Sequence, residues 1–183
     1  MIIDTLFLWF YRLDIHNALI ILAVGTVLFG IVRALLRKKY LWKPISALLL
    51  SVCLAVIFFS TLAGRSSGLL GQQKLSLPFY SYYSVLHGGN SEILRSNFMN
   101  VVLFYPAGLF ACELLPKSWS LAKRVILVAV LFALVSAGIE FCQYHFALGQ
   151  AEVDDVIHNA LGALIGALIS TIPVKWKLGK LKK

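Results

Sequence analysis

The sequence has little charge and few residues that crosslink or bind metals. Only 14% of its 183 residues are charged, and just eight are acidic. Its three cysteines stand apart without a C-x-x-C pair, which excludes a zinc ribbon or a disulfide framework as the basis of the fold. Hydrophobic residues make up 60% of the chain, against about 45–50% in a soluble domain. The composition indicates an all-α membrane protein.

Five apolar windows are long enough to cross a bilayer as helices, which takes about 20 apolar residues each. The windows are Ile15–Leu36, Pro44–Ala63, Phe98–Leu115, Val125–Phe146 and Val156–Ile172. They predict one domain over residues 1–183, a polytopic bundle of about five spans. Residues 1–14 are aromatic but do not resemble a cleaved signal peptide, so we expect an interfacial segment there.

The basic residues predict an orientation. They cluster around residues 33–43, 117–124 and 175–183, which puts thirteen on one side of the predicted bundle and four on the other. The positive-inside rule places the thirteen in the cytoplasm, so the N-terminus is outside and the tail 173–183 is cytoplasmic. Because these clusters flank apolar runs, they predict contact with the lipid bilayer and no nucleic-acid partner.

Four polar residues in the last two predicted spans are the candidate catalytic residues. Glu140 and Gln143 are three residues apart and share a helix face, and so do Asp155 and Asn159 at a spacing of four. An ionisable side chain inside a membrane costs about 2.5–3.5 kcal/mol, so such residues are usually paired and functional. We therefore expect the four to converge on one extracytoplasmic cavity, together with Arg95.

Two glycines continue the polar stripe of the last span. Gly162 and Gly166 lie deeper on the face of Asn159, and small residues at this spacing let two helices approach closely. The connection to the preceding span is short, so we expect the glycines to pack against that fourth span.

Further polar residues gather at the same side of the predicted bundle. Arginine suits phosphate, whereas acids and histidine suit acid–base work or a hard cation. An acid at a helix start can instead cap the helix, and Arg–Asp pairs can be purely structural. The candidate ligand-binding residues are Arg65, Arg95, Asn97, Asn100, Asp154 and His158. No metal site or cofactor is predicted, and a bridging divalent cation stays an open alternative.

The connection of residues 66–94 is the one long loop, which usually means a functional or mobile segment. Its aromatic residues suit anchoring in the lipid head groups or stacking on sugar rings. These are Phe79, Tyr80, Tyr82 and Tyr83.

The motifs resemble those of the VanZ-like membrane family, named after a protein associated with teicoplanin resistance in Gram-positive bacteria. The resemblance runs from about Thr61 to Gly166. It implies a small helical protein of the bacterial plasma membrane, with a role in glycopeptide resistance or cell-envelope stress. One departure is Gly149-Gln150, where many relatives have Gly-Arg, so anion binding would fall to Arg65 or Arg95. The motifs are Arg95-x-Asn97-x-x-Asn100, Phe104-x-Pro106-x-Gly108, Glu140-x-x-Gln143 and Asp155-x-x-x-Asn159-x-x-Gly162-x-x-x-Gly166.

Three functions fit the sequence. In the first, the protein binds a lipid-linked cell-wall precursor or another anionic lipid through Arg65 and Arg95. Alternatively, it is an enzyme that acts on such a lipid or its peptide, with Glu140 as the general acid or base. The third function is that of a transporter or proton pathway. The absence of an internal sequence repeat disfavours it.

Overall fold

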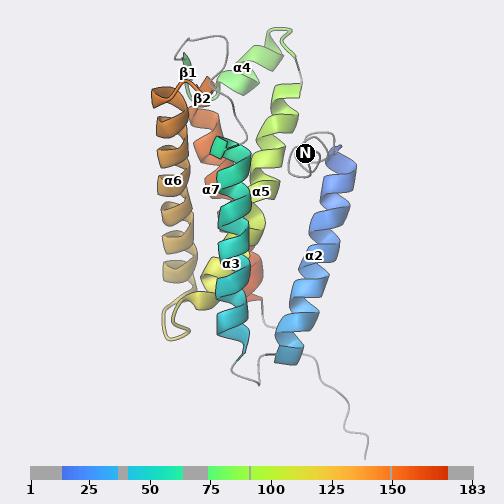
Figure 1. Ribbon diagram of the computed structural model, residues 1–183. Coiled ribbons are helices and arrows are strands. Elements are labelled where there is room, and N and C mark those ends of the chain that lie inside the picture. Colours follow the sequence, from blue (N-terminus) through green and yellow to red (C-terminus); the bar gives the residue numbers. More distant parts are fainter. Residues whose placement is uncertain (1–13, 37–40, 64–73, 91, 149, 173–183) are drawn as a thin grey trace, which may run out of the picture.

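A computed structural model describes residues 14–36, 41–63, 74–90, 92–148 and 150–172. Five helices in these ranges are long and apolar enough to span a membrane, which confirms the predicted all-α bundle. Figure 1 shows them side by side, alternating in direction. They are α2 (Ile15–Leu36), α3 (Trp42–Phe58) extended by the π-helical turn η1 (Phe59–Ala63), α5 (Glu92–Leu114), α6 (Leu121–His145) and α7 (Val153–Thr171).

The helix bounds follow the apolar windows, with one large difference. The structure places α2 where the window predicts it, but α5 begins at Glu92 rather than at Phe98. The extra turns carry Arg95 and Asn97, which an apolar window leaves out. A helix end at the head-group level tolerates such residues, so the helix extends beyond the hydrocarbon.

Helix α5 is the centre of the bundle and packs most closely against α7. A Cβ atom added to Gly166 would lie 2.1 Å from the carbonyl oxygen of Tyr105, and one added to Gly162 would lie 2.3 Å from that of Val101. The prediction that these glycines pack against the fourth span is therefore wrong, because their partner is α5. Helix α5 contributes Gly108 to the same contact, and small residues on both helices let the backbones touch.

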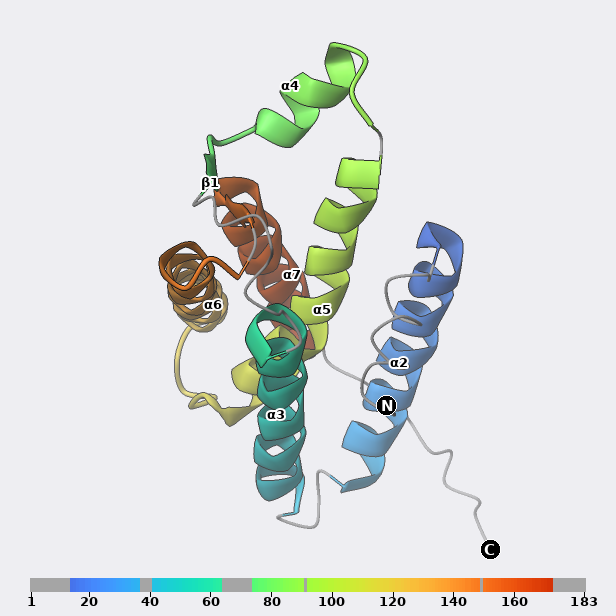
Figure 2. The same ribbon diagram turned by 45° about the horizontal axis from the view of Figure 1, so that its top comes forward.

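The long connection contains regular structure at one end of the bundle, which we call the α4 end. Strand β1 (Lys74–Ser76) pairs in parallel with β2 (Gln150–Glu152), directly before α7. The short helix α4 (Tyr80–Leu86) follows β1 and crosses above α7 towards the start of α5 (Figure 2). The first residues of α6 and the last of α5 lie at the opposite end.

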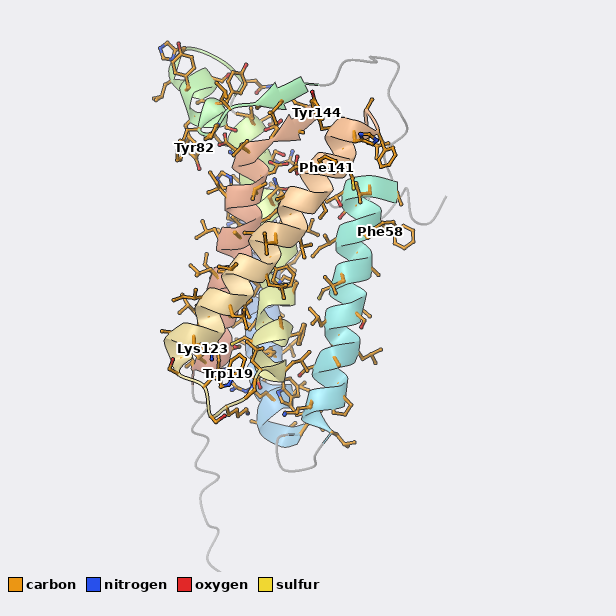
Figure 3. All side chains as sticks on the ribbon, turned by 90° about the vertical axis from the view of Figure 1, so that its left-hand side faces the viewer. Phe58, Tyr82, Trp119, Lys123, Phe141 and Tyr144 are labelled. Atoms are coloured by element: carbon orange, nitrogen blue, oxygen red, sulfur yellow. The ribbon has the colours of Figure 1, made fainter. Side chains whose placement is uncertain are left out.

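Aromatic residues mark both ends of the helices. Figure 3 shows Tyr82 and Tyr144 near the α4 end, and Trp119 with Lys123 at the opposite end. The Lys123 ammonium lies 4.2 Å from the centre of the Trp119 ring. Amphipathic aromatic rings and lysines favour the head-group region, so these positions fit the two boundaries of a bilayer.

Candidate functional site

Four helices enclose a small polar cavity at the α4 end. Its volume is about 30 Å³, enough for roughly one or two water-sized groups. All four candidate catalytic residues line it, so the structure brings them together as the spacing predicts. The lining residues are Ser60 and Thr61 of η1, Ser96, Met99, Asn100 and Leu103 of α5, Glu140 and Gln143 of α6, and Asp155 and Asn159 of α7.

Glu140 links the end of α6 to the start of α7. Its Oε2 accepts the backbone N–H of Glu152, the N-cap residue of α7, at 2.9 Å, and the side chain is 8% exposed. The first backbone N–H groups of a helix carry partial positive charge, which stabilises a nearby carboxylate. The connection between these helices therefore holds an acid at the wall of the cavity.

Two amide side chains are oriented by one hydrogen bond each. The Nδ2 of Asn159 donates to the Oγ of Ser136 at 2.8 Å, and the Nε2 of Gln143 donates to the carbonyl oxygen of Thr61 at 3.0 Å. Both side chains are buried, at 3% and 1% exposure. These bonds turn the amide oxygens away from Ser136 and Thr61.

Three of the lining residues have polar side-chain atoms without hydrogen-bond partners in the described part of the protein. These are the Oδ1 of Asn159, the Oε1 of Gln143 and the Nδ2 of Asn100, all buried. A buried polar atom without a hydrogen bond costs about 1–3 kcal/mol. The site therefore offers two acceptors and one donor to a group that enters it.

Arg95 and Asn97 lie outside this set of lining residues. The structure describes an ion pair between Arg95 and Glu92, one turn earlier on α5, with the Arg95 side chain 27% exposed. Asn97 is buried, and neither atom of its amide has a hydrogen-bond partner among the described residues. Ser96, between them, reaches the cavity. Arg65 lies outside the described residues.

Asp154 attaches α4 to the bundle. Its carboxylate is almost fully buried and accepts the backbone N–H groups of Phe79, at 2.5 Å, and Ser81, at 3.0 Å. These N–H groups belong to the first turn of α4. Asp154 therefore caps a helix, as the alternative interpretation allowed, but the helix is α4 rather than its own.

His158 supports the same attachment with both ring nitrogens. Its Nδ1 lies 2.6 Å from the carbonyl oxygen of Asp154, and its Nε2 lies 2.7 Å from the hydroxyl of Tyr82. Because a carbonyl only accepts, Nδ1 donates to it, and Nε2 shares a second hydrogen bond with the Tyr82 hydroxyl. Tyr82 thus holds α4 instead of being free for a ligand. Gln150 adds a side-chain bond to Ser76 between the strands.

A second buried polar cluster at the opposite end was not predicted. Glu113 is fully buried and pairs with Arg33 at 2.8 Å, while the indole Nε1 of Trp42 donates to it at 2.8 Å. A single acid in the apolar run of α5 was the available signal. Between the two polar clusters the described core is apolar, with Phe104 packed edge-on against Phe132, and this disfavours a continuous polar path.

Comparison with known proteins supplies the relationship. The family model described as VanZ/LLP1 matches residues 45–174, from within α3 to beyond α7, and thus covers every residue that lines the cavity. Neither the curated proteins nor the solved structures give a match. The five apolar helices make the protein a multi-pass membrane protein. The chain belongs to the VanZ/LLP1 family.

Proposed function

We propose that this protein binds the head group of an envelope lipid, a lipid-linked cell-wall precursor or another anionic lipid, in the cavity at the α4 end. The observation that carries the proposal is the set of buried amide atoms without partners beside Glu140 and Asp155. A hydroxyl group both donates and accepts, so a sugar or glycerol hydroxyl satisfies this mixed set. The volume of about 30 Å³ fits one such group rather than a whole head group.

The phosphate of this lipid lies outside the cavity in our proposal. Glu140 and Asp155 line the cavity and repel an anion there. Arg95 is adjacent to the lining residue Ser96 and partly exposed, and Arg65 follows η1 in the sequence. Arginine binds phosphate through two parallel hydrogen bonds. We therefore assign the phosphate to Arg95, next to a lining residue, and to Arg65, which follows η1 in the sequence.

Membership in the VanZ/LLP1 family supports a role at the bacterial envelope. We propose that the protein resides in the plasma membrane of a Gram-positive bacterium. There, lipid binding contributes to glycopeptide (teicoplanin) resistance or to the response to envelope stress. No cofactor enters this proposal.

Lipid binding to the purified protein in neutral detergent tests the proposal, with native mass spectrometry as the readout. Phosphatidylglycerol and an undecaprenyl-pyrophosphate sugar should bind about tenfold more tightly than phosphatidic acid, since two hydroxyl hydrogen bonds are each worth about 0.5–1.5 kcal/mol. Glu140→Gln should remove this preference. Asp14→Asn is the matched control. The Asp14 carboxylate accepts the backbone N–H of Asn17 at the start of α2 and does not line the cavity.

The arginines are tested by the same titration. Arg65→Ala or Arg95→Ala should weaken phosphatidic acid and phosphatidylglycerol alike, whereas Lys74→Ala should change little. If phosphatidic acid binds as tightly as phosphatidylglycerol, and Glu140→Gln does not change the affinity for either lipid, the cavity does not recognise hydroxyl groups. If both arginine variants also bind these lipids as tightly as the unmodified chain does, the polar residues at the α4 end serve only to stabilise the fold.

The enzyme alternative is favoured by one feature of the cavity. It has room for about one water molecule beside Glu140, a carboxylate that can act as a general base. Gln143 and Asn159 would orient that water. Incubation of labelled undecaprenyl-pyrophosphate sugar with substoichiometric protein distinguishes the two. Conversion of many equivalents identifies an enzyme, and unchanged lipid identifies a binder.

A further inference from the structure

A second cavity lies deeper in the membrane-spanning part, between α2, α3 and α5. Its volume is about 380 Å³, within the range of about 300–1,000 Å³ found for small-molecule pockets. The residues that line it are largely apolar. Tyr105 also lines it, but its hydroxyl is hydrogen-bonded to the Thr26 hydroxyl at 2.6 Å. We call this cavity the apolar groove. It is lined by Ile21, Leu22, Gly25, Phe29, Val52, Cys53, Val56, Val102, Leu103, Tyr105, Pro106, Leu109 and Phe110.

The apolar groove adjoins the polar cavity along two helices. Leu103 lines both. Leu103 lies on the same face of α5 as Met99, which lines the polar cavity. Phe110, which lines the groove, follows on that face at helical spacing. On α3, Val56 of the groove is one turn from Ser60 of the polar cavity. The two cavities thus adjoin at Leu103, and we call them together the track, which is polar at the α4 end and apolar towards the opposite end.

The track is about half as long as the hydrocarbon core of a bilayer is thick. Ten helical residues separate Asn100 from Phe110, which corresponds to about 15 Å. The hydrocarbon core of a bilayer is about 30 Å thick, and Phe110, three residues before Glu113 on α5, lies towards the opposite end of the bundle. Several of its side chains, Ile21, Val52 and Val56 among them, are more than half exposed in the described structure, so the groove is open along its side.

We propose that the apolar groove binds the hydrocarbon chain of the same lipid whose head group occupies the polar cavity; this inference rests on the proposed function. An unfilled apolar groove forfeits dispersion contacts, and a lipid chain can enter it directly from the bilayer. The α3–α5 track then selects an amphiphile by both parts, with the hydroxyl-bearing head above Leu103 and the chain below it.

A groove-filling variant and a matched control test this site. A Cβ atom added to Gly25 meets nothing within 4 Å, so Gly25→Leu should fold and place its side chain in the groove. Gly138 on α6 also has nothing within 4 Å of an added Cβ and does not line the groove, so Gly138→Leu is the control. The probe is phosphatidylglycerol with a diazirine in its acyl chain, in phosphatidylcholine vesicles that contain the full chain.

The expected result is photolabel on peptides that contain Val52–Val56 and Val102–Phe110. Gly25→Leu should remove most of this label, because the leucine side chain occupies the space that the lipid chain needs. Gly138→Leu should leave it unchanged. Equal label in Gly25→Leu, or label spread over the lipid-facing side of α6, overturns the inference. Label that appears only when residues 1–13 are removed assigns the groove to the chain's own N-terminal segment, and overturns it too.

Short-chain lipid separates a failure here from a failure of the proposed function. Dihexanoyl phosphatidylglycerol offers the same head group with chains too short to fill the groove. If it binds as tightly as the long-chain lipid, and Glu140→Gln weakens both, the head-group site stands and the groove inference falls. If groove label persists in Glu140→Gln while Gly25→Leu abolishes it, the groove takes any bilayer chain, and its link to the polar cavity is overturned.

Discussion

Replacement of Asp154 by Ala should release α4 without unfolding the bundle. The carboxylate accepts two backbone N–H groups from the first turn of α4, and a hydrogen bond to a charged group is worth about 1.5–3 kcal/mol. The loss is therefore about 3–6 kcal/mol. A helix of seven residues is marginal by itself, so the cost appears as local opening. Hydrogen exchange of the α4 amides should accelerate at least about a hundredfold.

Neighbouring variants sharpen this test. Asp154→Asn keeps one carbonyl oxygen for one of the two N–H groups and should give a smaller acceleration. Asp155→Asn is the matched control, because the bonds described for α4 run to Asp154 and His158 while Asp155 lines the cavity. It should leave the exchange of α4 unchanged. Normal α4 protection in Asp154→Ala would refute the capping role of this carboxylate.

Three further predictions concern packing, the second polar cluster and orientation. Gly166→Ala should lower the thermal stability in detergent, because its Cβ would lie 2.1 Å from a backbone oxygen of α5, whereas Gly138→Ala should be neutral or stabilising; equal melting temperatures would contradict the close contact. Glu113→Ala leaves Arg33 buried without its carboxylate and should cost about 3–5 kcal/mol in denaturant unfolding, whereas a cost below about 1 kcal/mol would contradict a tight pair. A reporter fused after Lys117 should read cytoplasmic, and an external reading would reverse the predicted orientation.

The sequence predicts the helices and the four candidate catalytic residues of the polar cavity because both depend on local periodicity, whereas Arg95, expected with them, does not line the cavity. Apolar runs define the spans, and a spacing of three or four puts Glu140 with Gln143, and Asp155 with Asn159, on shared faces. The short connection between α6 and α7 then brings the two pairs together. The start of α5 was predicted too late because its polar first turns carry no apolar signal, although they form regular helix.

The remaining features depend on partners that a sequence does not reveal. Asp154 binds backbone N–H groups more than seventy residues away, and every residue type except proline has such a group. The glycine stripe of α7 fits any smooth helix, so its spacing did not distinguish α5 from α6. Glu113 and Arg33 are far apart in the sequence and meet only through the packing of α2 on α5.

The most direct test of the account is an experimental structure of the protein in lipid nanodiscs that contain phosphatidylglycerol. The account predicts lipid density with its head group within hydrogen-bond distance of Gln143 Oε1 and Asn159 Oδ1, and with one chain along Leu103 towards Phe110. A cavity that holds only water, with lipid density confined to the outer surfaces of α2 and α6, would contradict it.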